Sequence, residues 1–360
     1  MKYVPLLLLG MFVFAGCASP TVFYKPGDLK LQEVARSQRR WTGVAVSPGG
    51  TIFVNYPRWS DDVTFSVGQL GTDRIARPFP DLAWNKWSAD QDPATHFVCV
   101  QSVVADSHNR LWVLDAARPQ FEGVVSGGAK LVCFDLASGK LIHNYRFSPS
   151  VVLPNSYLND VRIDTKLNYA YITDSGAGGL IVLDLQNGKA RRLHDNSPAT
   201  HAEKIDVMIN GSPWTFLGSK PQVHADGIAL SKGGRWLYFH ALTGRGLYRI
   251  DTQWLRDDRV TASQVADLVQ RVGTDRPCDG MEIDQAGNLY LTDIEQSSIT
   301  RVVRNENGTV RYDKLLSDSR LEWPDSFAWD SMGNLYVTTS RLGSAGEKGP
   351  FRLFKLVGAR

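Results

Sequence analysis

The segment DGMEIDQAGNLYL, residues 279–291, contains the pattern that decides the fold. A short apolar run is followed by a polar turn containing Gly and Asn, and then by a second run of aromatic and branched residues. This is the pattern of a β-hairpin. The chain holds six such segments, whose first residues lie 46 to 67 residues apart. They begin at Thr42, Gln101, Asn159, Asp226, Asp279 and Asp325. Repetition at such a spacing is typical of a repeat architecture.

Further strand-like runs follow most of these hairpins, for example 130–136 and 141–147 in the second repeat. Four strands per repeat predict an all-β, six-bladed β-propeller with four-stranded blades. Only 35 residues follow Asp325, which is too few for a whole blade. We therefore expect an N-terminal strand near Leu31–Arg36 to complete the last blade and close the ring. The alternatives, a β-sandwich or two unrelated β-domains, do not account for six copies in phase.

The N-terminus carries targeting signals. Residues Val4–Ala15 are almost all apolar, but the run is too short to span a bilayer as a helix, so we expect a cleaved signal peptide. The sequence Phe14-Ala15-Gly16-Cys17 resembles a bacterial lipoprotein box, in which cleavage precedes the cysteine and acyl chains, palmitate among them, are attached to it. Such chains would hold the protein on a membrane. An ordinary secretory peptide with an incidental cysteine is the alternative.

The expected organisation is therefore a signal peptide over 1–16, a lipidated Cys17 with a tether over 17–30, and a single propeller domain over 31–360. Ala18 resembles the sorting signal of outer-membrane lipoproteins. We expect the protein in the bacterial cell envelope, anchored to the outer membrane and facing the periplasm.

The composition excludes several classes. The 360 residues are 43% hydrophobic and 21% charged, and 40 basic residues are interleaved with 37 acidic ones. This balance argues against a nucleic-acid partner, which needs a basic stripe. The chain has no P-loop or Rossmann motif in a credible context, so we expect no nucleotide or organic cofactor. We also expect a monomer.

Three cysteines remain after Cys17. Cys99 and Cys133 belong to one repeat and could form a disulfide in an exported protein. Three is an odd number, however, and the spacing matches no zinc site. Buried free thiols are the alternative.

The first residues of the six segments form the candidate site. The innermost strands of a propeller line its channel, so these polar side chains should converge at one mouth. Several carboxylates close together need a cation, hydrogen bonds or protons. Carboxylate and amide oxygens suit Ca²⁺ or Mg²⁺, and Asn159, Asp226, Asp279 and Asp325 are the candidate ligands. The same residue types also cap turns in many repeats, which is the alternative.

Other residues complete the hypothesis. His224, two residues before Asp226, is a candidate proton carrier, and Asp279 is a candidate catalytic base. Gln101 and Thr42 are candidate contacts to a substrate. Candidate apolar walls are Trp84, Trp87, Trp214 and Trp323.

Several strings resemble the yellow/major royal jelly protein family. They are RLWVLD (110–115), KLVCFDL (130–136), YITDS (171–175) and the run over 227–250. The likeness extends from about Trp41 to Arg341. It implies a secreted six-bladed propeller that receives a small organic molecule at its channel mouth, with a tautomerase-like activity related to dopachrome conversion as one outcome.

The chain also resembles a wider group of propellers that includes gluconolactonase, regucalcin and diisopropylfluorophosphatase. This resemblance implies a channel cation held by one Glu, two Asn and one Asp. By repeat, the Asn positions correspond to Asn159 and Asp226, the Asp position to Asp279, and the Glu position to Thr42, while Asp325 could be a further ligand. A metal-dependent lactonase or ester hydrolase is therefore a second hypothesis. A non-catalytic binding or scaffold propeller is a third.

Overall fold

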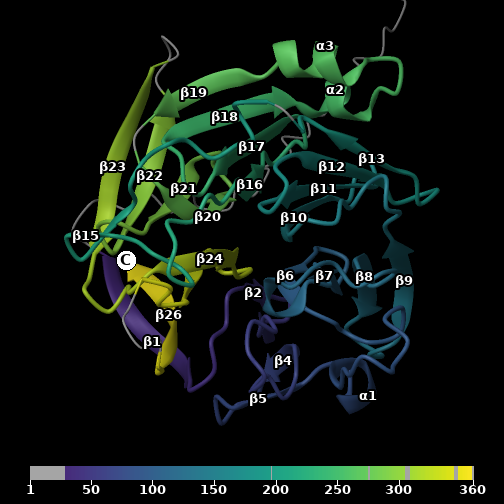
Figure 1. The fold of residues 1–360 in the computed structure, drawn as a ribbon. Coiled ribbons are helices and arrows are strands. Elements are labelled where there is room, and N and C mark those ends of the chain that lie inside the picture. The colour runs from purple at the N-terminus through teal and green to yellow at the C-terminus, as the bar shows by residue number, and fades with distance from the viewer. Residues whose placement is uncertain (1–28, 196, 275, 305–308, 344–347, 359–360) are drawn as a thin grey trace, which may run out of the picture.

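The computed structural model describes residues 29–195, 197–274, 276–304, 309–343 and 348–358 (Figure 1). Six four-stranded antiparallel sheets are arranged around a central channel, with one further two-stranded hairpin. The first strand of each blade contacts the first strand of the next, and the last contacts the first, so the inner strands form a closed ring. The predicted six-bladed propeller is confirmed.

Each blade is a meander whose strands run from the channel outward. Blades 1 to 3 consist of β2 (Val44–Val46), β3 (Ile52–Asn55), β4 (Val67–Leu70) and β5 (Ala76–Pro78); β6 (Val100–Ala105), β7 (Arg110–Asp115), β8 (Lys130–Asp135) and β9 (Leu141–Arg146); and β10 (Leu158–Asp164), β11 (Tyr169–Asp174), β12 (Leu180–Asp184) and β13 (Ala190–Leu193). Blades 4 to 6 consist of β16 (Ala225–Leu230), β17 (Trp236–Ala241), β18 (Gly246–Asp251) and β19 (Gln270–Thr274); β20 (Cys278–Ile283), β21 (Leu289–Asp293), β22 (Ser298–Arg304) and β23 (Val310–Ser317); and β24 (Pro324–Trp329), β25 (Leu335–Thr339), β26 (Phe351–Gly358) and β1 (Leu29–Ser37).

The remaining elements are short and lie between strands. They are α1 (Leu82–Asn85), the 3-10 turn η1 (Pro119–Phe121), the hairpin β14 (Met208–Ile209) and β15 (Ser212–Pro213), α2 (Thr252–Arg256) and α3 (Ala262–Asp267). No helix among the described residues is long and apolar enough to cross a membrane. Cys17 and the predicted signal peptide lie outside the described residues.

Both ends of the chain build blade 6. The strand β1 pairs antiparallel with β26, from Leu29 opposite Gly358 to Ser37 opposite Phe351. In Figure 1 this pair appears as purple beside yellow. The predicted closing strand is confirmed, and it is longer than expected because alternate residues such as Leu29, Leu31 and Ala35 pack into the core. The N-terminal strand therefore completes the fourth position of blade 6.

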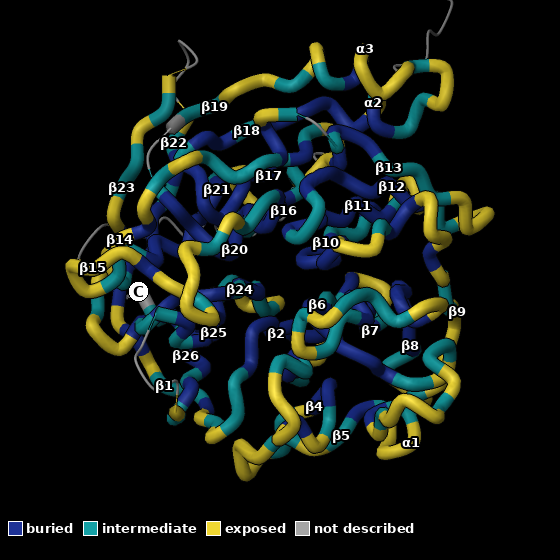
Figure 2. The backbone as a smooth tube through the Cα atoms, viewed as in Figure 1, coloured by how far each residue is buried: buried dark blue, intermediate teal, exposed yellow. Residues whose placement is uncertain are grey.

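Hydrophobic clusters lie between neighbouring blades and hold the ring together. Trp112 of blade 2 and Val161 of blade 3 share one cluster, and Tyr171 of blade 3 and Phe239 of blade 4 share another. Figure 2 shows that the inner and middle strands are mostly buried, whereas the outer strands and hairpin turns are mostly intermediate or exposed. Burial on both faces explains why these strands read as continuous apolar runs.

A bulge near the start of each inner strand from β10 onward positions the channel residues. In β16, for example, Ala225 lies opposite Ala241 and the register shifts before Ile228. The equivalent shifts in β10, β20 and β24 begin at Leu158, Cys278 and Pro324. A bulge adds one residue and re-aims its side chain. It therefore sets the direction of the polar residue that directly follows it.

Threonines of the second strands hold these bulges and join neighbouring blades. Thr292 Oγ1 accepts from the backbone N–H groups of Asp279 (3.1 Å) and Gly280 (2.9 Å). Thr173 Oγ1 accepts from Asp160 N at 3.1 Å and donates across the blade boundary to Asp226 O at 2.6 Å. The blade boundaries are therefore fixed by buried hydrogen bonds directly beneath the channel residues.

The glycine of the Asp-Gly pairs is required by this close approach. A Cβ on Gly280 would lie 2.1 Å from Asp325 O, and one on Gly227 would lie 2.3 Å from Asp279 O. Only a residue without a side chain allows the backbones of adjacent blades to come so near.

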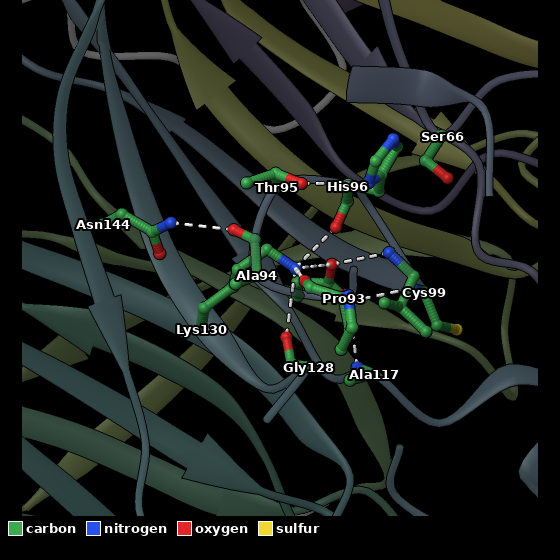
Figure 3. A network of polar contacts seen from close by, with 12 residues as sticks. Ser66, Pro93, Ala94, Thr95, His96, Cys99, Ala117, Gly128, Lys130 and Asn144 are labelled. Atoms are coloured by element: carbon green, nitrogen blue, oxygen red, sulfur yellow. Dashed lines mark hydrogen bonds and ion pairs between the residues drawn. The ribbon is translucent and has the colours of Figure 1, made fainter. Parts of the chain in front are cut away.

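Blade 2 contains a fully buried ion pair (Figure 3). Lys130 Nζ lies 2.7 Å from Asp115 Oδ2 and also donates to the backbone oxygens of Pro93, His96 and Gly128 at 2.7 to 3.0 Å. The Asp115 carboxylate accepts from the N–H groups of Val98, Cys99 and Ala117 at 2.7 to 2.9 Å. Every charge here has partners, so the pair fastens the segment before β6 to the blade.

Cys99, Cys133 and Cys278 are buried free thiols. The disulfide between Cys99 and Cys133, considered from the sequence, is absent from the structure.

Candidate functional site

A cavity of about 280 Å³ lies at the mouth of the channel where the inner strands begin. It is called the mouth pocket below. Of the six residues that open the repeats, five line it: Gln101, Asn159, Asp226, Asp279 and Asp325. The convergence expected from the repeat is therefore present. It arises because the bulges aim one polar side chain per blade toward the mouth.

Thr42 is the exception. It is 1% exposed, its hydroxyl donates to Gln101 O at 3.2 Å, and it accepts from Asn55 Nδ2 at 2.9 Å. Asn55 ends β3 and performs in blade 1 the bonding role that threonines perform in blades 3, 5 and 6. Thr42 is therefore occupied by the link between blades 1 and 2 and does not line the mouth pocket.

Three carboxylates meet at the base of the mouth pocket. Asp226, Asp279 and Asp325 are each less than 8% exposed. Asn159 Nδ2 donates to Asp226 Oδ1 at 2.5 Å, and the carboxyl groups of Asp226 and Asp279 lie close enough to affect each other's pKa. Buried carboxyl groups this close repel one another when charged, so the arrangement favours bound protons.

Each of these carboxyl groups has a raised pKa. Burial is the largest cause for all three. The charge of Asp279 raises the pKa of Asp226 and of Asp325 further, and both lie well above the usual value. The pKa of Asp279 is raised to about 7, because the Trp323 indole N–H, 2.6 Å from its Oδ2, favours the charged form and offsets part of the burial effect. Near neutral pH the cluster therefore holds protons and can exchange one.

No cation neutralises the cluster from within the described chain. No Lys, Arg or His among the described residues lies within ion-pair distance of Asp226, Asp279 or Asp325. The nearest basic side chain along the channel strands is Arg162 of blade 3. It donates to Met281 O of blade 5 at 2.5 Å and lies 3.5 Å from Glu282, so it crosses the channel beyond the cluster.

Aromatic side chains form the walls of the mouth pocket. Phe121 stacks on Tyr157 at a centroid separation of 5.4 Å and contacts Trp59 at 5.5 Å and Phe216 at 5.5 Å. Trp59 Nε1 donates to the Tyr157 hydroxyl at 2.5 Å, and that hydroxyl donates to Gln101 Oε1 at 2.9 Å. The rings are therefore fixed before any ligand arrives, and the apolar walls lead to an acidic base.

Part of the wall comes from the insertion between blades 3 and 4. Trp214 and Phe216 belong to this segment and line the mouth pocket. Trp214 Nε1 donates to Leu342 O at 3.2 Å, and its ring lies 4.5 Å from that of Trp323. The insertion therefore docks on the loops of blade 6 and extends over the mouth.

The predicted tryptophans divide into two groups. Trp214 lines the mouth pocket, and Trp323 bonds Asp279 at its base. Trp84 instead packs against Phe97 and Phe134 between blades 1 and 2, and Trp87 packs against the cluster between blades 2 and 3. Their expected place at the mouth was wrong, because the α1 loop follows the outermost strand of blade 1.

His224 lies close to the mouth but not in its lining. Its Nδ1 accepts from Ala202 N at 3.0 Å, and its ring is 4.7 Å from that of His201. Burial and the neighbouring His201 lower the pKa of His224, with Asp174 acting in the opposite direction. Its role as proton carrier stays a prediction, and the carboxylates are better placed for it.

The donor set differs from the one that the gluconolactonase-like group implies. Among the described residues no three His, Cys, Asp or Glu side chains are grouped as ligands of one metal ion. Thr42 at the Glu position is buried in the blade link, and the Asn159 amide nitrogen is turned toward Asp226. The residues as arranged fit shared protons better than a resident divalent cation. Occupancy by Ca²⁺ or Mg²⁺ stays a prediction.

These observations define the class: a six-bladed propeller with an aromatic pocket above a buried cluster of carboxyl groups. The sequence model of the Major royal jelly protein family matches residues 98–349, and the chain belongs to that family. Protein yellow of Drosophila yakuba and that of Drosophila melanogaster are each 25% identical over 237 residues, covering 61% of this chain and 43% of the relative. The chain thus spans less than half the length of these relatives.

Solved structures confirm the fold. A gluconolactonase from Xanthomonas campestris has a TM-score of 0.56 at 14% identity, with 93% of this chain and 91% of that chain covered. A regucalcin, described as a calcium-binding protein, from Agrobacterium tumefaciens has a TM-score of 0.55 at 13% identity, with 91% and 94% covered. At such identities the likeness extends to the propeller alone.

Proposed function

We propose that the mouth pocket binds a small aromatic molecule that carries an ammonium group or another acidic proton. The observation that carries this proposal is the cluster of Asp226, Asp279 and Asp325, which is buried without a cation beneath aromatic walls. Apolar walls that lead to a few fixed polar groups are typical of small-molecule sites. An organic cation would supply the missing positive charge.

The walls support the same ligand class. Trp59, Phe121 and Phe216 present rings to the cavity, and aromatic faces attract organic cations. A cation that displaced the protons of the cluster would form charge-assisted hydrogen bonds to the carboxylates, which are about twice as strong as neutral ones.

The cluster can also move protons. A general acid and base work best when the pKa lies near the operating pH, and the pKa of Asp279 is raised to about 7. Asp226, whose pKa is raised well above its usual value by burial and by the charge of Asp279, lies beside it. One carboxyl group that accepts a proton and one that donates a proton are what a tautomerase needs. We therefore propose proton transfer within the bound molecule as the activity.

Calorimetry with benzylamine and benzyl alcohol tests the binding proposal. We expect benzylamine to bind and benzyl alcohol to bind much more weakly, with Asp279→Asn losing most of this preference. Equal affinity for amine and alcohol would contradict the proposal. Repeating the titration after EDTA treatment distinguishes this proposal from a metal-dependent hydrolase. Such a hydrolase would lose its function on chelation and regain it with Ca²⁺.

We also propose that the protein is lipid-anchored through Cys17, and that the propeller faces the periplasm. Labelled palmitate should be incorporated by the full chain and not by Cys17→Ser. Incorporation by both proteins would contradict the anchor.

A further inference from the structure

Arg118 also lines the mouth pocket and brings a positive charge to it. It directly precedes η1, in the connection between β7 and β8 of blade 2. In a ring of six blades, blade 2 lies opposite blade 5, which carries Asp279. The mouth pocket therefore has a positive group and a carboxyl cluster that come from opposite blades, and aromatic rings line the same cavity.

The bonding of Arg118 leaves donors available. Its Nη1 donates to Asn155 O at 2.8 Å, whereas its Nε is buried and has no partner in the described structure. No Asp or Glu of the described residues forms an ion pair with it. Arg162 and Arg192 also have a buried Nε without a hydrogen-bond partner, but each has a carboxylate at another nitrogen: Glu282 at 3.5 Å and Asp174 at 2.7 Å. A buried donor without a partner is costly unless a ligand supplies the acceptor.

A guanidinium offers a fork of donors that matches a carboxylate. The backbone bond to Asn155 fixes one arm of the fork, so the remaining donors are held in place before binding. The aromatic ring of Phe121, three residues further on, stacks against Tyr157 and positions the turn that carries Arg118. Such preorganisation lowers the entropy lost on binding.

We propose that Arg118 binds a carboxylate of the ligand, so that the mouth pocket selects aromatic molecules with an ammonium group at one end and a carboxylate at the other. The ammonium end lies at Asp226, Asp279 and Asp325, and the ring lies between the aromatic walls. This inference rests on the proposed function, because it assumes a cation at the carboxylate cluster. It adds the second anchoring point and hence the specificity.

The test compares three probes that share one ring: benzylamine, benzoate and 4-(aminomethyl)benzoate. For the wild-type full chain we expect 4-(aminomethyl)benzoate to bind about tenfold more tightly than benzylamine, the usual gain from a hydrogen-bonded charge. In Arg118→Gln the two should bind equally. Arg146→Gln, at an exposed position on the outer strand β9, is the matched control and should keep the tenfold gain.

The outcomes separate the two proposals. No gain from the added carboxylate, or a gain that persists in Arg118→Gln, would overturn the role of Arg118 while leaving the binding of benzylamine intact. Binding of benzoate that depends on Arg118, without any binding of benzylamine, would instead overturn the proposed function and keep Arg118 as an anion site. Thermal melting of each variant shows whether it is folded.

Discussion

Two buried acidic groups of this propeller are treated in opposite ways. Asp115 in blade 2 has Lys130 and three backbone N–H groups as partners and is completely buried. Asp279 at the channel mouth has one indole N–H, a neighbouring carboxyl group and no cation. The first arrangement satisfies a charge and stabilises the fold. The second leaves a charge unsatisfied, which is typical of a site where function is favoured over stability.

The largest effect should come from breaking the satisfied pair. Lys130→Met leaves Asp115 charged and buried without its cation, so we expect a loss of about 4 kcal/mol in the free energy of unfolding. Urea denaturation measures it. Lys189→Met is the control, since its pair with Asp258 is exposed and should contribute less than about 1 kcal/mol. A similar small loss in both variants would remove the distinction between structural and functional carboxylates.

The second-largest effect should be a pH dependence of the free energy of unfolding. The pKa of Asp279 is raised from 3.8 to about 7 on folding, so the folded state binds the proton more tightly. Its stabilising contribution is complete below the unfolded pKa and is lost as the pH rises through about 7. Between pH 5 and pH 8 we expect wild type to lose about 3 kcal/mol relative to Asp279→Asn. Parallel pH profiles of the two proteins would contradict the raised pKa.

Replacing Asp by Asn should change the free energy of unfolding in opposite directions at the two sites. Asp279→Asn removes a poorly solvated charge, so we expect a gain of about 2 kcal/mol in the free energy of unfolding at pH 8. Asp115→Asn leaves Lys130 without its counter-ion and should destabilise the protein. Denaturation of both variants at pH 8 checks this, and destabilisation by both would show that the cluster is structural.

The smallest effect should come from Trp323. Its indole N–H favours the charged form of Asp279, so Trp323→Phe should raise the pKa of Asp279 by about one unit, worth about 1 kcal/mol. Carboxyl ¹³C NMR titration measures the midpoint. Trp214→Phe is the matched control, because its indole donates to Leu342 O and not to a carboxylate. An equal shift in both variants would point to a general packing effect.

The sequence predicts the fold well because the propeller is periodic. The Asp-Gly pairs recur where blades approach most closely. Only 35 residues follow Asp325, so the sequence also predicts that an N-terminal strand completes the last blade. The same periodicity predicts that Gln101, Asn159, Asp226, Asp279 and Asp325 meet. Thr42 is an exception because Asn55, at the position that holds Thr in blades 3, 5 and 6, ties it into the blade link.

The walls of the site are harder to predict. Trp59, Phe121, Tyr157 and Phe216 come from connections between strands, whose course is not periodic. Arg118 is one of many arginines in the sequence, and only the structure shows that it lines the cavity with an unpartnered Nε. Trp84, like Trp214, is a tryptophan in a loop between strands, but it lies in a core between blades.

The central claim is that the Asp279 cluster holds protons that an organic cation displaces. Calorimetry of benzylamine binding at pH 6, in two buffers with different ionisation enthalpies, measures this directly. We predict binding with release of up to one proton per benzylamine, and little release by Asp279→Asn. Binding with no difference between the buffers, or no binding at all, would contradict the account.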